Sequence, residues 1–229
     1  MHDRPYTLLS CSVSMDGYIA TAASRLLLSN AADFDRVDAV RASCDAILVG
    51  ATTVRNDNPR LVVRSQARRD ERTARGLTPS PMKVTVTSRA ELDARAAFFT
   101  TGETEKLVYC ARSWVGDARA RLESVATVVD GGHAVEMSGL RNDLAARGVE
   151  RLMVEGGGTV HTQFLTADLV DELQLVVAPV FVGDSHAPRF VRDGCFPWNP
   201  ARRARLAAVR QIGDVVLLRY ALSSRFEDD

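Results

Sequence analysis

The chain has no excess of charge of either sign and no long apolar segment. Its 29 Lys and Arg residues balance its 29 Asp and Glu residues, and this balance argues against nucleic acid or an anionic membrane as a partner. No stretch approaches the roughly 18 apolar residues that cross a bilayer, and the first residues lack the apolar region of a secretory signal. With 46% hydrophobic and 25% charged residues, we expect a cytoplasmic protein with an ordinary core.

Cysteine is scarce, and its spacing excludes several roles. Cys11, Cys44, Cys110 and Cys195 are far apart and form no C-x-x-C pair or Cys/His cluster. A zinc site or a redox motif is therefore not indicated, and reduced thiols are expected. We predict no metal site.

Arginine is concentrated in one place, residues 60–76. Its members there are Arg60, Arg64, Arg68, Arg69, Arg72 and Arg75. Without an overall basic excess, such a run is most simply a solvated loop or helix face. Residues 65–80 are also the one stretch that resembles a linker, and no internal repeat is present. We expect residues 1–229 to form a single domain.

Short β-rich runs alternate with helical patterns along most of the chain. Strands are predicted at 6–14, 46–50, 61–63, 83–88, 106–110, 127–129 and 149–155, and helices around 34–40 and 140–148. This alternation implies parallel strand pairing. The last part differs, because 171–184 reads as a strand broken at Pro179 and 204–222 reads as a hairpin. We predict an α/β fold whose mixed, mostly parallel sheet ends in an antiparallel C-terminal hairpin.

Three glycines follow a carboxylate in "RLMVEGGGTVHTQFL" (residues 151–165). An apolar strand ends at Glu155, and a helix is expected to open with Thr159 as its N-cap. A helix N-terminus after glycines can bind an anion, because free N–H groups and the helix dipole point at it. No Gly-Lys-Ser/Thr follows, and the acidic residues Asp171 and Glu172 precede a strand, so neither a P-loop nor a Rossmann fingerprint is present. The pattern alone leaves open a phosphate site or a tight turn that merely packs.

Three segments, in order along the chain, resemble one known family. They are "SCSVSMDGYIA" (10–20), "FDRVDAVRASCDAILVGATTVRNDNPRLVVR" (34–64) and "LMVEGGGTVHTQFLTADLVDELQLVVAPVFVGD" (152–184). The chain is similar to the reductase domain of the bifunctional riboflavin-biosynthesis deaminase/reductase, in a stand-alone, actinobacterial-type form. The fused zinc deaminase domain has no counterpart, since no H-x-E with a following P-C-x-x-C occurs. The resemblance implies a dihydrofolate-reductase-like fold, NADPH as cofactor and a homodimer.

The resemblance also implies where the cofactor binds. The glycine loop, here residues 157–163, is similar to the stretch that holds the pyrophosphate and nicotinamide side, and Ser88 falls where the family meets the adenosine end. Arg89 beside it would suit a 2′-phosphate, because a dianion requires donors and positive charge. The expected cofactor-binding residues are Ser12, Thr53, Asp57, Ser88, Arg89, Gly156, Gly157, Gly158, Thr159 and Val160.

The implied substrate is a ribosylamino-pyrimidine 5′-phosphate, reduced through its open imine to a ribitylamino product. The substrate-binding residues implied by the resemblance are Ser29, Arg41, Leu61, Arg64 and Glu155. Guanidinium groups suit a sugar phosphate, and a carboxylate that ends a buried strand should meet a polar partner. Protonation of the imine nitrogen makes its carbon a better hydride acceptor, so the candidate catalytic residues are Asp57 as acid or positioning group and Glu155 as substrate ligand.

The chain departs from the family pattern at Ser10, Leu26 and Asn58, where bacterial members usually have Lys, Trp and Asp. The loss of a lysine removes a positive group beside the reacting centre, so these departures bear on the substrate more than on the cofactor. They keep open an NADPH reductase of a pterin, folate-like or secondary-metabolite substrate. A non-catalytic NADPH-binding module is a further alternative.

Overall fold

The computed structural model describes residues 4–21 and 26–226, which divide into two units. The first unit is built on the continuous stretch Val37–Met153, and the second combines Tyr6–Arg36 with Val154–Asp229. Helix α1 (Ala31–Ala42) and strand β6 (Arg151–Gly156) contribute residues to both units. The expectation that residues 1–229 form a single domain stays a prediction.

Four parallel strands form the sheet of the first unit. They are β2 (Ala46–Gly50), β3 (Met82–Thr87), β4 (Lys106–Cys110) and β5 (Thr127–Asp130). Their order is β5-β4-β3-β2, and the pairs in register include Gly50 with Val86 and Thr87 with Cys110. β2 is buried along its whole length, as expected for a parallel strand covered on both faces. The predicted strands 46–50, 83–88, 106–110 and 127–129 are confirmed to within a residue.

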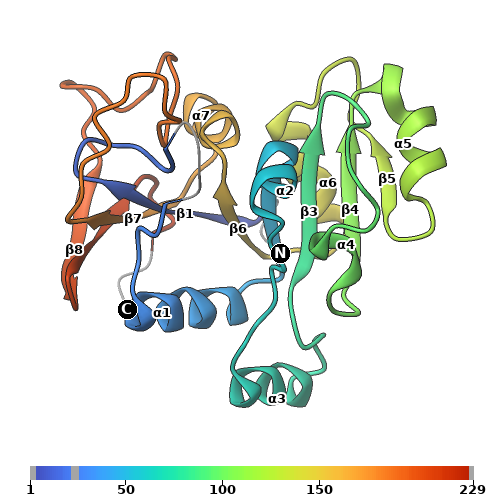
Figure 1. Cartoon of the computed structure of the whole chain (residues 1–229), viewed down its shortest axis with the longest axis horizontal. Helices are drawn as coiled ribbons and strands as arrows, with labels where there is room; N and C mark the ends of the chain where they lie inside the picture. The colour runs from blue at the N-terminus through green and yellow to red at the C-terminus, as the bar shows by residue number, and fades with distance from the viewer. Residues whose placement is uncertain (1–3, 22–25, 227–229) are drawn as a thin grey trace. The chain divides into compact units, whose positions relative to one another are not determined.

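The helices of the first unit connect these strands (Figure 1). They are α2 (Ala51–Asp57), α3 (Gln66–Ala74), α4 (Ala97–Thr100), α5 (Val115–Leu122) and α6 (Met137–Ala146), with a 3₁₀ turn at Arg112–Trp114. Two expectations for the segment between β2 and β3 are wrong. Residues 61–63 form no strand, and the linker-like stretch 65–80 contains α3, which projects below the strands in Figure 1.

The basic run 60–76 is only partly a solvated surface. Arg72 is buried, and its guanidinium donates to the carbonyl oxygens of Thr78 (2.9 Å), Ala42 (2.7 Å) and Cys44 (2.8 Å). Arg69 donates to the carbonyl oxygen of Val63 at 2.8 Å. These arginines fasten α3 by donating to several backbone carbonyl groups, which a guanidinium can do because its five N–H donors are arranged in one plane.

The second unit contains the antiparallel part of the fold. Its strands are β1 (Tyr6–Ser14), β7 (Glu172–Ala178), β8 (Arg205–Ile212) and β9 (Val215–Ala221), in the order β1-β7-β9-β8. β1 and β7 are parallel, whereas β7–β9 and β8–β9 are antiparallel. The predicted C-terminal hairpin is confirmed, with Gly213 at φ +63° in its turn. β7 ends just before Pro179, which cannot donate to a ladder.

Side chains alternate across β7 and β9, and one face carries an apolar cluster. Its buried members are Leu28, Val176, Ala178, Ile212, Val215 and Leu217, with Leu26 and Val180 packed against them. Helix α7 (Gly158–Thr166) follows β6 in this unit. No helix among the described residues is both long and apolar enough to cross a bilayer.

Candidate functional site

The carboxyl ends of β2 and β3 bring together three of the predicted cofactor residues. Helix α2, which carries Thr53, begins directly after β2, and Ser88 follows the last residue of β3. Because these strands are parallel and in register, both ends lie at one edge of the sheet. Ser88 and Arg89 are exposed there. The hydroxyl of Thr87 donates to the carbonyl oxygen of Arg89 and accepts from the amide of Arg89, which makes a tight turn. Ligands of parallel α/β sheets bind at this edge.

The predicted substrate residues of the first unit gather instead around the loop 58–65. Arg41 lies in the last turn of α1 and donates to the carbonyl oxygen of Val62 at 3.5 Å. The backbone amide of Arg64 donates to Asp38 of the same helix at 2.5 Å. Leu61 is buried and adopts a left-handed conformation with φ +46°. A bulky residue in that region is costly, and residues with such strain cluster at functional sites.

Asp57 lies between these two groups along the chain. It is the last residue of α2 and is partly buried. Asn58 follows in a left-handed conformation (φ +44°), which ends the helix, and its side-chain oxygen accepts from the amide of Ala97 at 2.6 Å. Asparagine tolerates this conformation better than most residues. Asn58, at the position where the resembling bacterial proteins usually have Asp, therefore preserves the turn that presents Asp57.

Lys83 is a charged group in this unit that the sequence pattern did not single out. It is fully buried, and its ammonium donates to the carbonyl oxygens of Phe98 (3.1 Å) and Thr101 (2.5 Å). Burial, together with the positive charges of Lys106 and Arg41, lowers the pKa of Lys83 to about 8. Because the charges of Lys83 and Arg41 repel each other, Lys83 also adds positive electrostatic potential at Arg41. The sequence does not reveal that Lys83 is buried, because a lysine at the start of a strand usually points into water.

In the second unit, α7 begins earlier than predicted. Its N-cap is Gly157, without a side-chain capping bond, and Thr159 lies within the first turn. The expectation that Thr159 is the N-cap is therefore wrong. Gly157 has φ +92° and ψ 130°, a combination that side chains other than glycine rarely adopt. The first N–H groups of a helix have no partner within it, so this uncapped end leaves donors for an anion.

Gly158 has a different reason to be glycine. A Cβ atom built there would lie 2.4 Å from the carbonyl oxygen of Arg189. The segment around Arg189 therefore packs directly on the start of α7. Of the two interpretations left open by the sequence, close packing accounts for Gly158, whereas Gly157 provides the turn. Admission of a phosphate stays a prediction.

The remaining predicted residues of the second unit occupy strand ends and a helix start. Glu155 is the penultimate residue of β6 and Ser12 lies in β1, both partly buried. Val160 is buried within α7. The hydroxyl of Ser29 donates to Asp33 at 2.6 Å, just ahead of α1. Ser29 is thereby oriented from the first turn of that helix.

His161 lies within the glycine loop 157–163, with no individual role predicted for it, and is buried one turn into α7. Its Nδ1 lies 3.0 Å from the carbonyl oxygen of Phe190, and its Nε2 has no partner among the described residues. Burial lowers the pKa of His161 to about 4, against a smaller opposite effect of the Phe190 bond. The ring is therefore neutral at pH 7, and it joins α7 to the segment that packs on Gly158. A single histidine in an apolar stretch gives no sequence signal for this role.

A family model described as the RibD C-terminal domain matches residues 5–218. The chain belongs to this family. A relative from Archaeoglobus fulgidus, named 2,5-diamino-6-ribosylamino-4(3H)-pyrimidinone 5′-phosphate reductase, is 34% identical over 97% of this chain and 99% of its own length. A protein of the same name from Methanothermobacter thermautotrophicus is 33% identical over 96% and 99%.

Solved structures agree with the predicted fold. RibD from Acinetobacter baumannii superposes with a TM-score of 0.79 at 25% identity, over 96% of this chain but 58% of that one. A pyrimidine reductase-like protein from Corynebacterium diphtheriae gives a TM-score of 0.80 at 21% identity, over 95% and 91%. The α/β fold with a mostly parallel sheet and an antiparallel C-terminal part is that of the RibD reductase domains, which confirms the dihydrofolate-reductase-like class.

Proposed function

We propose that this protein is an NADPH-dependent reductase of 2,5-diamino-6-ribosylamino-4(3H)-pyrimidinone 5′-phosphate, a step of the riboflavin-biosynthesis type. The observation that carries the proposal is the match to reductases of that name over nearly their entire length. A sequence identity of about one third over nearly the whole chain indicates a shared fold. The side chains at strand ends must then supply the chemistry.

The residues present fit a nicotinamide dinucleotide phosphate. The uncapped start of α7 and the bare backbone of Gly157 offer N–H donors to a pyrophosphate. Thr53, Ser88 and Arg89 lie at one sheet edge, where hydroxyl and guanidinium groups suit a phosphorylated ribose. When bound, NADPH supplies a hydride.

The substrate carries a 5′-phosphate, and we assign it to the loop 58–65. Arg41 and Arg64 supply guanidinium groups, and buried Lys83 adds positive potential near Arg41. Leu61, held in its left-handed conformation, fixes the backbone of this loop. We assign the ribose or pyrimidine to Glu155 and Ser29, because carboxylate and hydroxyl oxygens accept from hydroxyl and amino groups.

The chemical step adds a hydride to C1 of the open-chain imine and a proton to its nitrogen, so that the C=N bond becomes CH–NH. Asp57 either delivers this proton or positions the group that does. Positioned acids of this kind typically contribute about 10²–10⁴-fold to the rate. The other residues align substrate and cofactor without forming a covalent bond to either.

A second candidate, a reductase of a pterin, folate-like or other metabolite, was motivated by Ser10 and Leu26. Ser10 is buried within β1, and Leu26 packs on the apolar cluster of β7 and β9. Leucine at position 26 is thus accommodated as a packing residue, which favours neither substrate. A non-catalytic module would bind NADPH without oxidising it.

The decisive experiment measures NADPH oxidation by the purified protein with the phosphorylated ribosylamino-pyrimidinone, and separately with dihydrofolate. We expect turnover with the first and none with the second, together with a ribitylamino product by mass spectrometry. Turnover with dihydrofolate alone would support the second candidate. Tight NADPH binding with no oxidation by either compound would support the non-catalytic module.

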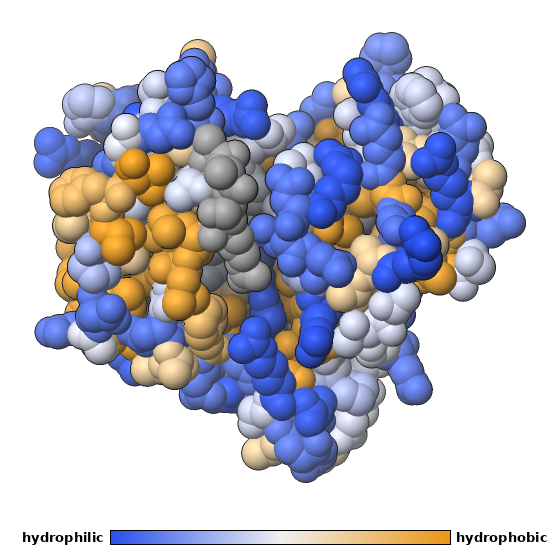
Figure 2. All heavy atoms as spheres, in the orientation of Figure 1, coloured by the Kyte–Doolittle hydropathy of each residue, from blue (hydrophilic) through white to orange (hydrophobic). Residues whose placement is uncertain are grey.

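We further propose that the protein is a cytoplasmic homodimer. All four cysteines are free, as expected in a reducing compartment. The face of β7, β8 and β9 opposite the apolar cluster is itself apolar, with Val209 61%, Leu206 49% and Val216 36% exposed. Figure 2 shows apolar side chains gathered on the side of β8. A patch beside an open edge strand suits pairing with a second copy.

A further inference from the structure

Ser29, assigned above to the substrate, is hydrogen-bonded to a buried carboxylate. Its hydroxyl donates to Asp33 Oδ2 at 2.6 Å, and the other oxygen of Asp33 accepts from Arg36 Nε, also at 2.6 Å. The side chain of Asp33 is 1% exposed and that of Arg36 is 12% exposed. Each oxygen of this carboxylate therefore has a donor from the protein, and water has little access to either.

Arg36 is held on its other side by the sheet of the second unit. Its NH1 donates to Gln174 Oε1 at 2.5 Å, and Gln174 Nε2 donates to Glu172 Oε1 at 2.8 Å. Glu172 also accepts from Tyr6 (2.9 Å) and from Arg219 (2.9 Å). Gln174 and Glu172 are two residues apart in β7 and buried, so they point to the same face of the sheet. A continuous chain of hydrogen bonds thus connects the start of α1 with β1, β7 and β9.

The chemistry of the partners fixes the direction of these bonds. A carboxylate accepts and cannot donate, whereas a guanidinium donates and cannot accept. Gln174 must therefore turn its oxygen to Arg36 and its nitrogen to Glu172. By the same rule the hydroxyl hydrogen of Ser29 points at Asp33, and the lone pairs of the Ser29 oxygen are left for a ligand.

The backbone that carries Ser29 is fastened separately from its hydroxyl. Asn30 Oδ1 accepts from the amide of Asp33 at 3.0 Å and so caps α1. Asn30 Nδ2 donates to the carbonyl oxygen of Ile212 and to Asp214 Oδ1, both at 2.7 Å, which ties the start of α1 to the turn between β8 and β9. The carboxylate of Asp33 is therefore not needed for the cap, and it acts on the orientation of the hydroxyl.

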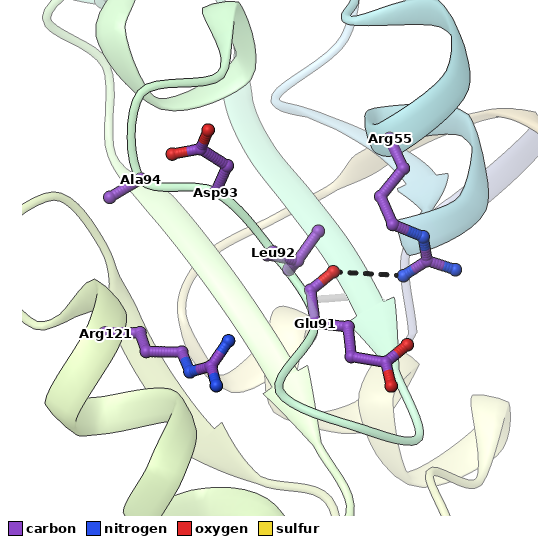
Figure 3. Close-up of a pocket in the computed structure, with 6 residues that line it drawn as sticks. All are labelled: Arg55, Glu91, Leu92, Asp93, Ala94 and Arg121. Atoms are coloured by element: carbon purple, nitrogen blue, oxygen red, sulfur yellow. Dashed lines mark hydrogen bonds between the residues drawn. The ribbon is translucent and has the colours of Figure 1, made fainter.

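Burial distinguishes this network from polar contacts at the surface. Figure 3 shows a depression of the first unit, lined by Arg55, Glu91, Leu92, Asp93, Ala94 and Arg121. There Arg55 is exposed and donates to the carbonyl oxygen of Glu91 at 3.1 Å. An exposed group can exchange such a partner for water at little cost. Asp33 cannot, because the loss of a partner would leave a buried charge unpaired.

We infer that Asp33 is a positioning residue that makes Ser29 a hydrogen-bond acceptor towards the substrate, so that this position selects a hydroxyl or an amino group. The inference rests on the proposed reduction of the ribosylamino-pyrimidinone phosphate. A carbonyl or phosphate oxygen in the same place would set lone pairs against lone pairs and leave both acceptors unpaired. The 5′-phosphate must then bind elsewhere, which agrees with its assignment to the loop 58–65.

The test is a double-mutant cycle on the full chain. It measures KM and kcat for the phosphorylated ribosylamino-pyrimidinone, and by calorimetry the Kd values of that compound and of NADPH. In Asp33→Asn only the amide oxygen can accept from Arg36, so the amide nitrogen faces Ser29 and turns its hydroxyl hydrogen towards the ligand. We expect KM and substrate Kd to rise about tenfold because a donor then opposes a donor. With kcat changed less than about twofold, this is the signature of lost uniform binding.

Ser29→Ala should raise KM about fivefold, the loss of one neutral hydrogen bond. Adding Asp33→Asn to Ser29→Ala should raise it no further, because the hydroxyl through which Asp33 acts is gone. Asp35→Asn, at an exposed position of the same helix, is the matched control and should leave every constant unchanged. NADPH affinity should be the same in all variants.

Circular dichroism checks that each variant folds. If Asp33→Asn does not fold, Arg36→Lys takes its place in the cycle. Lysine keeps the charge but lacks the planar fork that reaches both Asp33 and Gln174, so KM should rise about threefold, and only while Ser29 is present.

Additive effects of the two substitutions would overturn the inference, because a purely structural Asp33 would act whether or not residue 29 carries a hydroxyl. An unchanged KM in folded Asp33→Asn would overturn it as well, and normal turnover by the unmodified protein would leave the proposed reaction standing in both cases. Coupled effects on substrate Kd without any turnover would support the role of Asp33 and refute the reaction. An unmodified protein that neither binds nor reduces the pyrimidinone would overturn both.

Discussion

Asp38 accepts a hydrogen bond from the backbone amide of Arg64, 2.5 Å away. The carboxylate is buried, and it also accepts from the amide of Ser65 (3.1 Å) and the guanidinium of Arg68 (3.0 Å). One side chain of α1 therefore holds both the loop that presents Arg64 and the start of α3. Burial opposes ionisation of Asp38, but these three donors outweigh it and lower its pKa.

We predict that Asp38→Asn will raise the KM for the phosphorylated substrate about tenfold while leaving NADPH affinity unchanged. An amide offers one acceptor oxygen in place of two, so the loop loses donor contacts, at a cost of roughly 1–3 kcal/mol in unfolding free energy. Asp35→Asn on the same helix is the control. A normal KM with reduced stability would show that Asp38 serves the fold alone. Because its pKa is lowered on folding, the stabilisation by Asp38 should be present above the unfolded carboxyl pKa and disappear in acid.

Asp57→Asn should lower the rate of hydride transfer far more than it weakens NADPH binding. Asparagine keeps the size of the side chain and the turn at the end of α2, but it cannot deliver a proton, so a loss of about 10²–10⁴-fold is expected. Stopped-flow measurement at saturating NADPH gives the rate of a single turnover. Asp70→Asn makes the same charge change on exposed α3. A rate within about threefold of the unmodified enzyme would leave Asp57 as a turn-forming residue.

His161 should make the protein less stable as the pH falls from about 6.5 towards 4. The folded pKa of about 4 lies below the ordinary 6.5, so the unfolded chain binds a proton in this window while the folded chain does not. The loss approaches about 3 kcal/mol, and it ends below pH 4, where both states are protonated. Urea unfolding at several pH values measures it. The same curve for His161→Phe should be flatter in this window, and parallel curves would contradict the prediction.

Gly158→Ala should destabilise the protein by about 1–3 kcal/mol, because the new methyl group would meet the carbonyl oxygen of Arg189 at 2.4 Å. Gly139 in α6 is the matched control, since a Cβ there meets nothing within 4 Å. Gly139→Ala should be neutral or stabilising by up to about 1 kcal/mol. Thermal unfolding of both variants decides the matter. Equal midpoints would show that the segment at Arg189 yields without cost.

Val209→Glu should convert the proposed dimer to monomers. Val209 is 61% exposed and pairs with Leu218 on the face of β8 and β9 opposite the apolar cluster. A carboxylate there would be buried without a partner in a dimer. Arg210→Glu, at the next position of β8 and hence on the opposite face, is the control. Sedimentation gives the mass of each variant. An unmodified protein that is monomeric at micromolar concentration would refute the dimer.

Strands were predictable where apolar residues are contiguous. The predicted ranges 46–50 and 106–110 coincide with β2 and β4, because a parallel strand that is buried on both faces consists of consecutive apolar residues. Helix α2 gives no clear signal in the sequence, because its N-cap, Gly50, has no capping side chain and the helix buries only two residues, Ala51 and Val54. Residues 61–63 resemble a strand in the sequence, because three consecutive apolar residues are too few to show a helical or strand periodicity. The left-handed backbone of Leu61 cannot be recognised from the neighbouring residues.

The location of a candidate residue was predictable where it lies at the end of a strand: Ser88 directly follows β3, and Glu155 is the penultimate residue of β6. The end of a strand is visible in the sequence, and it fixes where the next residues lie. Contacts between distant segments were not predictable. The carboxylate of Asp38 and the carbonyl of Arg189 acquire their roles only when α1 meets the loop 58–65 and when the segment after β7 meets α7.

The pairing of β1 with β7 also sets the order in which the chain can fold. Leu8 pairs with Glu172, and the neighbouring Thr7 and Asp171 are 164 residues apart in sequence. Closing so long a loop is slow, whereas the first unit is a continuous stretch with nearer contacts. During synthesis, the first unit can close while β1 still lacks both β7 and the hairpin of β8 and β9. The strand β1 then lacks its neighbours until β6 and β7 have been synthesised, and in that interval it is open to aggregation and to chaperones.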